Sequence, residues 1–356
     1  MREQFSVVSL FSGGGGLDLG FKAAGFDIKW AIDINANAVA SYRRNVSPDI
    51  ICGDISHINI STIPHADVVI GGPPCQSFSL AGKRNCDDER GQLVWRYFDI
   101  IKALKPKAFL FENVVGLLSA KRADGGKILD GLLNMFAEIG YHLSWKLVNA
   151  ADYGVPQLRK RVIIVGTNHG CFTFPEPQYN ADGSNGKRRY ISVSDAIGDL
   201  PPVGTACITD HEMPCMSQLD KYIVSHVRPG GNYMDIPDEV PSVRIRRLKQ
   251  EGGHTTCYGR MHPDKPSYTI NTFFNRPNVG CNIHYAEDRL ITVREAMRLQ
   301  TFPDDYTLVS TSKKDKNLIV GNAVPPRLAY ELAKQLKANL IENIENHVDK
   351  QHRQRD

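Results

Sequence analysis

Residues 5–21 have the sequence FSVVSLFSGGGGLDLGF, in which a short apolar run leads directly into four glycines and then an amphipathic segment. The run 5–11 predicts a buried strand, and 17–24 predicts a helix. Glycines at such a junction let the backbone turn tightly and approach a ligand, with the N–H groups of the helix available to it. The plainer alternative is that they only make a tight turn. In either case the stretch predicts the start of an α/β domain.

The same alternation continues through the first half of the chain. Further apolar runs that predict strands lie at 28–32, 67–71, 107–112 and 161–167. Segments with apolar residues at helical spacing lie at 35–44, 93–104 and 127–139. Strands that alternate with helices predict βαβ units, and hence a mostly parallel sheet covered by helices on both faces.

The second half differs in composition. From about residue 175 the chain is rich in Pro, Gly, Asn and charged residues, which is typical of an exit from a compact domain. Helical spacing returns at 293–300 and 325–345, and the polar end from 346 predicts a frayed tail. A chain of 356 residues is long enough for two domains.

Composition narrows the classes of protein that remain. Hydrophobic residues make up 42% and charged residues 23%, as in ordinary globular proteins. The net charge of +4 is too small for a polycation, so a nucleic-acid partner would need a local basic patch. No secretory signal or membrane-spanning run is recognisable, and the eight cysteines show no CxxC spacing. We therefore expect a cytoplasmic protein with reduced thiols and no metal site.

Two acids follow successive strands of the predicted sheet. Asp33 lies 20 residues after Gly13, close to the spacing at which an acid meets a ribose, and Asp54 follows the run 50–52. Acids at the ends of neighbouring parallel strands converge on the crevice where nucleotide-like ligands bind. This pattern fits a dinucleotide or another adenosine-bearing cofactor. Taken singly, Asp54 also fits a helix cap.

The most specific feature is the loop GGPPCQSFS at residues 71–79. Two glycines permit an unusual turn, and two prolines then fix φ and stiffen the chain. This arrangement predicts that Cys75 is presented at the carboxyl end of a strand, where active sites of open sheets lie. The alternative for an isolated cysteine is a small buried hydrophobic residue.

The loop GPPCQSFS resembles the nucleophile loop of the DNA (cytosine-5) methyltransferases. Five further blocks, in the same order as in that family, are FSGGGGLDLGF, the ENV of 112–114, the QxRxR of 157–161, REAMRLQTFP at 294–303 and GNAVPP at 321–326. The resemblance covers the chain except for about 180–260, and it outweighs the dinucleotide alternative. It implies an α/β, class I S-adenosylmethionine-dependent methyltransferase (Rossmann-like) sheet with a smaller target-recognition domain. The catalytic domain would be 1–180 plus 317–356, and the DNA-binding domain 181–316.

The resemblance also implies a reaction. Carbon 5 of cytosine is a poor nucleophile until a thiolate adds to carbon 6, so covalent catalysis by Cys75 would split one hard step into two. Glu112 would contact N3 and the exocyclic amine of the base. The plainer alternative for Glu112 is a buried acid at a strand end that is paired with an arginine. Arg161, and with less support Arg159, would hold O2 and the loop that bears Cys75. The base would be extruded from the duplex to reach this site. The group that removes the C5 proton is not visible in the sequence.

The implied donor site draws on several strand ends. Its expected members are Phe11, Gly13, Gly15, Asp33, Ile34, Asp54, Ile55, Pro74, Leu93 and Asn322. Asp33 would meet the ribose hydroxyls of S-adenosylmethionine, and Asp54 with Ile55 the adenine. One departure is visible: many relatives have an acid immediately before the Leu-Phe of the first loop, where this chain has Ser9.

DNA contacts are expected from both domains. Near Cys75 they are Gln76 and Ser79. In the variable region, cations outnumber acids, which suits phosphate contact, although charged runs are often only solvated surface. The expected residues there are Arg244, Arg246, Arg247, Arg260 and Thr269, the last in a Thr-Ile element that relatives place beside the extruded base.

The sequence thus predicts a prokaryotic or phage-borne enzyme that methylates C5 of cytosine in a specific double-stranded DNA site. Two alternatives are a tRNA cytosine-5 methyltransferase and a non-catalytic DNA-binding homologue. The triplet CFT at 171–173 occurs in the tRNA enzymes but at a later position, and intact Cys75, Glu112 and Arg161 argue against the non-catalytic homologue. A monomer is expected. A cognate restriction endonuclease is left open as a partner, and the recognition site is not predicted.

Overall fold

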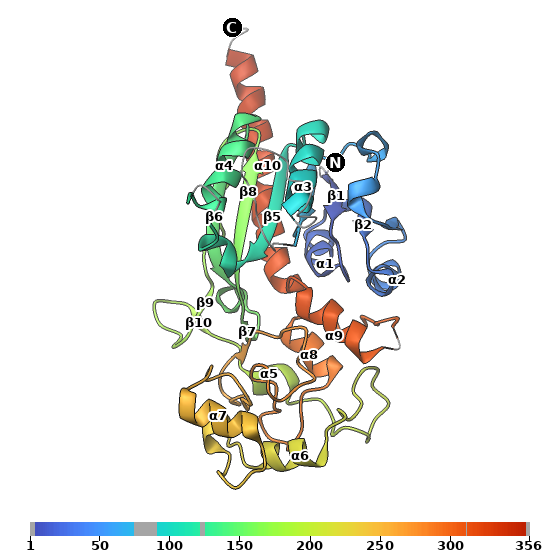
Figure 1. Cartoon of the computed structure of the whole chain (residues 1–356). Coiled ribbons are helices and arrows are strands. Elements are labelled where there is room, and N and C mark those ends of the chain that lie inside the picture. The colour runs from blue at the N-terminus through green and yellow to red at the C-terminus, as the bar shows by residue number, and fades with distance from the viewer. Residues whose placement is uncertain (1–3, 75–90, 122–124, 311, 354–356) are drawn as a thin grey trace. The chain divides into compact units, whose positions relative to one another are not determined.

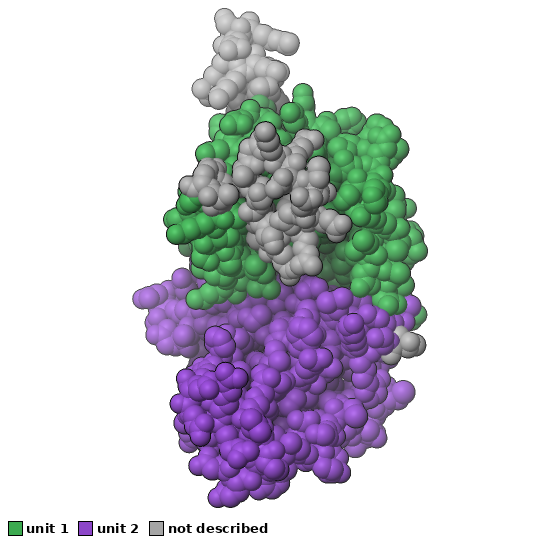
Figure 2. All heavy atoms as spheres, viewed as in Figure 1, with its two compact units in different colours: residues 1–148, 160–176, 328–356 green, residues 149–159, 177–327 purple. Residues whose placement is uncertain are grey.

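The computed structural model describes residues 4–74, 91–121, 125–310 and 312–353. The chain forms two compact units, distinguished by colour in Figure 2. Unit 1 consists of Met1–Val148, Lys160–Glu176 and Leu328–Asp356, and unit 2 of Asn149–Arg159 and Pro177–Arg327. Residues 149–159, 177–180 and 317–327, which the predicted boundaries place in the catalytic domain, pack within unit 2. What each domain does stays a prediction.

Unit 1 is built on a seven-stranded sheet with the order β3-β2-β1-β4-β5-β8-β6. Its strands are β1 (Ser6–Leu10), β2 (Asp27–Asp33), β3 (Ile50–Cys52), β4 (Val68–Gly71), β5 (Ala108–Val114), β6 (His142–Asn149) and β8 (Lys160–Thr167) (Figure 1). From β3 to β5 all neighbours are parallel, and β8 then runs antiparallel to β5. The predicted α/β fold is confirmed.

Strand β6 is the one strand of this sheet that the sequence did not indicate. It lies at the edge of the sheet, and Val148 is its one buried residue. A strand with so few buried positions gives no apolar run and no clean alternation, so its pattern resembles that of a loop.

Helices cover both faces of the sheet. They are α1 (Gly16–Ala23), α2 (Ala36–Asn45), α3 (Gly91–Leu104), α4 (Ile128–Glu138) and α10 (Pro326–Arg353). Buried residues of α3 and α4 pack with Phe109 and Phe111 of β5 on one face. On the other, Tyr42 of α2 packs with Ala31 of β2 and Ile50 of β3. The sheet is therefore the middle layer of three.

Helix α10 belongs to unit 1 from Leu328 onward and packs against α1. A Cβ atom at Gly20 of α1 would lie 2.4 Å from Cβ of Ala329, so the two backbones approach too closely for any side chain. The helix continues to Arg353. The frayed tail expected from residue 346 was therefore wrong, because the polar residues there extend the last helix.

Unit 2 contains mostly short elements and loops. Its strands are β7 (Gln157–Leu158), β9 (Tyr179–Asn180), β10 (Arg188–Arg189) and β11 (Ser267–Tyr268), and its helices are α5 (Val193–Ile197), α6 (Gln218–Ser225), α7 (Val243–Glu251), α8 (Val293–Leu299) and α9 (Lys313–Asn322). One of its cores joins Ile223 and Val224 of α6, Ile245 of α7, and Ile283 and Leu290 of later loops. Burial of these scattered residues, and not a large sheet, holds the unit together.

Candidate active site

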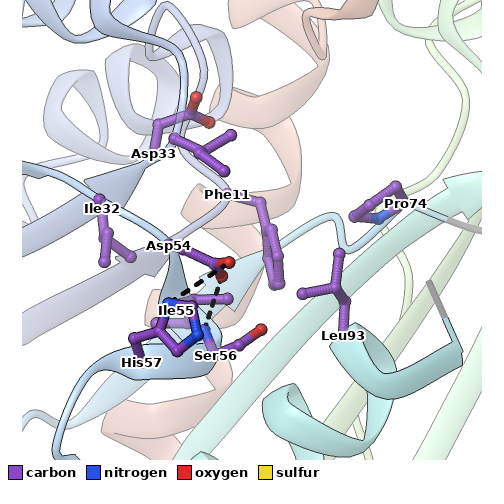
Figure 3. Close-up of a pocket in the computed structure, with 11 residues that line it drawn as sticks. Phe11, Ile32, Asp33, Asp54, Ile55, Ser56, His57, Pro74 and Leu93 are labelled. Carbon is purple, nitrogen blue, oxygen red and sulfur yellow. Dashed lines mark hydrogen bonds and ion pairs between the residues drawn. The ribbon is translucent and has the colours of Figure 1, made fainter. Parts of the chain in front are cut away.

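A pocket of about 380 Å³ opens at the carboxyl ends of the parallel strands. Its lining comes from the segments that follow β1, β2, β3 and β4, together with α3: Phe11, Ile32, Asp33, Ile34, Gly53, Asp54, Ile55, Ser56, His57, Pro74 and Leu93. In Figure 3 the Phe11 ring extends between Asp54 and Ile55 on one side and Leu93 and Pro74 on the other. The volume and the mixture of apolar walls with a few polar groups suit a small organic ligand.

Phe11 has φ 55°, in the left-handed region that residues with a Cβ rarely adopt. Gly13, at φ 54°, then completes the turn toward α1. Strained backbone of this kind persists only where surrounding contacts hold it, and it is common at ligand sites. The turn carries the aromatic ring of Phe11 into the pocket.

Asp33, at the end of β2, stabilises this turn by hydrogen bonding. Its Oδ2 accepts a 2.8 Å hydrogen bond from the Gly13 backbone N–H, and its Oδ1 accepts one of 2.8 Å from the Asn35 N–H. Burial raises the pKa of Asp33, and these two hydrogen bonds oppose that rise. The carboxylate keeps lone pairs on both oxygens, so it can also accept hydroxyl donors such as those of a ribose.

Asp54 is the more exposed acid of the pocket. It caps the short 3₁₀ helix at Ile55–His57, and its Oδ1 accepts a 2.8 Å hydrogen bond from the Ser56 N–H. That hydrogen bond lowers the pKa of Asp54. The cap that the sequence offered as an alternative is therefore present, and the same residue also lines the pocket.

Seven of the ten expected donor-site residues line this pocket: Phe11, Asp33, Ile34, Asp54, Ile55, Pro74 and Leu93. Gly13 and Gly15 do not line it but shape the adjoining loop, and Asn322 is the exposed last residue of α9 in unit 2. Four further residues that the sequence did not indicate also line the pocket: Ile32, Gly53, Ser56 and His57. All four lie within three residues of Asp33 or Asp54, so proximity to a strand-end acid is the signal that they share.

Glu112 and Arg161 form an ion pair at the same edge of unit 1. The distance from Arg161 Nε to Glu112 Oε1 is 2.8 Å, and each side chain is 13% exposed. In the antiparallel pairing of β5 and β8, Arg161 lies opposite Val114, two residues beyond Glu112, so both side chains point to one face of the sheet. The pair is thus preorganised by the strands themselves.

The segment after β4 runs directly beside this pair. A Cβ atom at Gly72 would lie 2.8 Å from Oε2 of Glu112, and Nδ2 of Asn113 donates a 3.0 Å hydrogen bond to the carbonyl of Pro73. Pro74, the next residue, lines the pocket. Three consecutive residues therefore connect Glu112 with the pocket. The predicted residues Cys75, Gln76 and Ser79 lie outside the described residues.

Arg159 is placed differently from the expectation that it holds the target base. Its side chain is among the largest fully buried ones, and it donates to the carbonyls of Ile270 at 3.0 Å and Gly321 at 2.9 Å. Gln157 is also buried and accepts a 3.0 Å hydrogen bond from the Ile270 N–H. These two residues hold the Thr-Ile and GNAVPP segments within unit 2. The base contact expected of Arg159 stays a prediction.

The expected DNA-contacting residues of unit 2 fall into two groups. Arg244, Arg246 and Arg247 are exposed on α7, and Arg247 pairs with Glu251 at 2.7 Å. Thr269 is half-buried, and its hydroxyl donates to the carbonyl of Leu158 at 2.8 Å.

Arg260 forms the second group, because it is only 5% exposed. Its guanidinium donates to four backbone carbonyls and to the Asp288 carboxylate. No donor is left for a phosphate, so the expected DNA contact of Arg260 was wrong. A buried arginine cross-link and an exposed phosphate contact have the same local sequence pattern.

Within the described parts of the chain, no group of three His, Cys, Asp or Glu side chains is arranged to hold a metal ion. The helices of that part of the chain include none with the length and hydropathy needed to cross a membrane.

Comparisons with known proteins agree with this geometry. Residues 5–338 match the family model of the C-5 cytosine-specific DNA methylases. The chain is 38% identical to the type II methyltransferase M.NgoFVII of Neisseria gonorrhoeae, covering 95% of this chain and 88% of that protein. It is 36% identical to M1.HphI of Haemophilus parahaemolyticus, with the same two coverages.

Solved structures extend the likeness to the fold. A protein described as a prophage-encoded DNA modification methyltransferase (E. coli) superimposes with a TM-score of 0.63 at 26% identity, covering 95% of this chain and all of that one. The family model, the relatives and the sheet with its strand-end pocket lead to one conclusion. The chain belongs to the C-5 cytosine-specific DNA methylase family and is a DNA cytosine-5 methyltransferase.

Proposed function

We propose that the protein transfers a methyl group from S-adenosylmethionine to C5 of a cytosine that is extruded from a specific double-stranded DNA site. The observation that carries this proposal is the course of Gly72, Pro73 and Pro74, which run from beside Glu112 to the wall of the pocket. The next residue in the chain is Cys75. A nucleophile at that point would stand between a donor in the pocket and a base held by Glu112.

The pocket residues fit an adenosine-bearing sulfonium. Asp33 has free lone pairs for ribose hydroxyls, Phe11 and Leu93 offer apolar walls, and Asp54 and Ile55 would flank the adenine. When bound there, S-adenosylmethionine would supply an electrophilic methyl carbon. The strained turn at Phe11 and Gly13 would orient it.

We assign the remaining steps to residues of unit 1. The Cys75 thiolate would add to C6 of the cytosine, which makes C5 nucleophilic, and C5 would then take the methyl group. An unassigned base would remove the C5 proton as the C6–S bond breaks and the thiolate is released. Glu112 would hold N3 and the exocyclic amine as charge builds on the ring. Arg161 would fix the Glu112 carboxyl through their 2.8 Å contact and reach O2 of the base. Closely placed donors of this kind are worth about 2.7–4 kcal/mol of transition-state stabilisation.

The DNA would be held partly by Arg244, Arg246 and Arg247 of α7 through phosphate contacts. We propose that the protein acts as a monomer on the DNA of a prokaryotic cytoplasm. We also propose that it protects a site that a cognate endonuclease would cut, because type II relatives are among those it matches.

Substitution Cys75→Ser tests the covalent step. We expect it to abolish methyl transfer while DNA affinity changes less than about two-fold, because a serine hydroxyl is far less ionised than a thiol at neutral pH. Bisulfite sequencing of DNA from a host that expresses each form reports the product and its sequence context together.

The exposed Cys171 supplies the matched control, since Cys171→Ser should transfer methyl groups normally. Duplex DNA with 5-fluorocytosine at the methylated position should become covalently attached to the wild type and not to Cys75→Ser. Normal transfer by Cys75→Ser would refute the covalent step.

A further inference from the structure

Asp18 is a fully buried acid in the first turn of α1 that the reaction described above does not use. Its Oδ1 accepts a 2.8 Å hydrogen bond from the hydroxyl of Tyr42 on α2. The Ser9 hydroxyl at the end of β1 approaches the carboxyl closely enough to favour its charged form, but Oδ2 has no hydrogen bond of good geometry within the described part of the chain. One oxygen of this buried carboxyl is therefore incompletely satisfied.

The surroundings of Asp18 lead to the donor loop. The Ser12 hydroxyl donates to the Ser9 hydroxyl at 2.9 Å, and the next residue, Gly13, is held by Asp33. Asp33 itself lines the pocket and interacts electrostatically with Asp18. Asp18 thus lies beneath the Gly-rich turn, connected to it by two serine hydroxyls.

Keeping this carboxyl costs stability. Burial raises the pKa of Asp18 to about 6, so at neutral pH the folded protein carries a negative charge that solvent would hold more favourably. A group whose pKa is raised on folding favours the folded state below its unfolded pKa of 3.8, and that contribution is lost as the pH rises through about 6. An asparagine would keep the shape and an acceptor for Tyr42 without this charge. The charge itself is therefore the feature that needs an explanation.

The proposed reaction supplies one. The donor carries a positive sulfonium, and the product, after its methyl group has moved to cytosine, is a neutral thioether. A buried negative charge near the pocket attracts the positive sulfonium of the donor but not the neutral thioether of the product. In a low-dielectric interior this attraction acts beyond contact distance.

We propose that Asp18 is a positioning and specificity-determining residue whose carboxylate, held beneath the Gly-rich turn, favours the cationic methyl donor over the neutral product. The inference rests on the proposed donor. It predicts that the chain binds S-adenosylmethionine more tightly, relative to S-adenosylhomocysteine, than it would without this charge.

The test is calorimetric titration of wild type, Asp18→Asn and Asp67→Asn with both compounds at pH 7.5. Asp18→Asn should bind the donor about ten-fold more weakly and the product within about two-fold of wild type. It should unfold at a temperature equal to or higher than wild type. If Asp18 had a purely structural role, the Asp18→Asn substitution would lower the unfolding temperature and would reduce the affinities for both compounds together.

Asp67→Asn is the matched control. Asp67 bonds Ser6 at the other end of β1 and pairs with Lys107, so its loss should lower stability without changing either affinity. A pH series adds a second readout. Wild-type preference for the donor should decline as the pH falls through about 6 and be flatter in Asp18→Asn.

The titratable groups that face Asp18 among the described residues are Tyr42 and Asp33. Asp33 stays in both proteins, so the difference between the two pH series isolates Asp18. Equal donor affinities for wild type and Asp18→Asn would overturn this inference while methyl transfer by the wild type continued. Absence of methyl transfer by the wild type would instead overturn the proposed function.

Discussion

Arg159 and Arg161 are two residues apart in one motif, yet they belong to different units and have different surroundings. Arg159 in unit 2 is buried and donates to backbone carbonyls, so its charge holds loops together. Arg161 in unit 1 is paired with the Glu112 carboxylate near the end of β5, and each of the two side chains is partly exposed. The comparison teaches that residue type and spacing indicate a site, and that the partner of each guanidinium decides its role.

The largest effect that separates the two arginines is expected from alanine substitution. Arg161→Ala should lower the rate of methyl transfer by about 10³-fold and leave the protein folded, because it would remove the donor that we propose holds the reacting base. Arg159→Ala should lower the free energy of unfolding by about 3 kcal/mol, because it leaves two buried carbonyls unsatisfied and opens a cavity. Single-turnover transfer of labelled methyl groups and urea unfolding measure the two quantities.

Lys160→Ala is the control for both, since this exposed neighbour should alter neither rate nor stability. If Arg159→Ala instead lowered the rate of methyl transfer and left the free energy of unfolding unchanged, Arg159 would act in the reaction. The two arginines would then not differ in role.

The next largest effect is a difference between the two units in how their stability depends on pH. Burial lowers the pKa of His284 in unit 2 to about 4, so its stabilising contribution is complete above the unfolded value of 6.5 and is lost as the pH falls toward 4. The contribution of Asp18 to the stability of unit 1 changes with pH in the opposite direction over nearly the same pH range. Each contribution is at most about 3 kcal/mol.

Hydrogen exchange of segments at pH 5 and pH 7.5, corrected for intrinsic rates, should therefore show unit 2 losing protection on acidification before unit 1 does. His284→Gln should remove most of the loss in unit 2. Equal loss of protection in both units would contradict these assignments.

The smallest effect concerns DNA. Arg246→Ala combined with Arg247→Ala should weaken binding by about ten-fold at physiological salt and reduce the dependence of affinity on salt concentration, because two exposed cations are removed. Arg260→Ala should instead lower the unfolding temperature and leave the salt dependence of the folded protein unchanged, since that guanidinium is fully occupied. Fluorescence anisotropy over a range of salt concentrations measures the DNA affinity. If the affinity of the double variant depended on salt concentration in the same way as that of the wild type, α7 would not contact DNA.

The features that the sequence predicted well are local. The strand, the Gly-rich turn and the acid at Asp33 are coupled through a spacing of 20 residues, and the glycine N–H does bond that acid. Glu112 was expected from the resemblance of residues 112–114 to the ENV motif, and it lies near the carboxyl end of β5.

The sequence did not indicate the buried surroundings of Arg159 and Arg260, because their partners are distant along the chain. The carbonyls that Arg159 meets lie 111 and 162 residues further along the chain, and the farthest partner of Arg260 on the amino-terminal side lies 36 residues back. Burial of a charged side chain depends on such tertiary contacts, which no local pattern contains.

The contact of Gly20 with Ala329 has a consequence for the order in which the protein is made. Helix α1 emerges early from the ribosome, but the surface that covers it is translated after nearly all of unit 2. The apolar side of α1 therefore stays exposed during most of the synthesis of the chain, until α10 has been translated. A nascent chain stalled before residue 328 would contain all of unit 2 and an incomplete unit 1, and its exposed apolar surface would make it a target for chaperones.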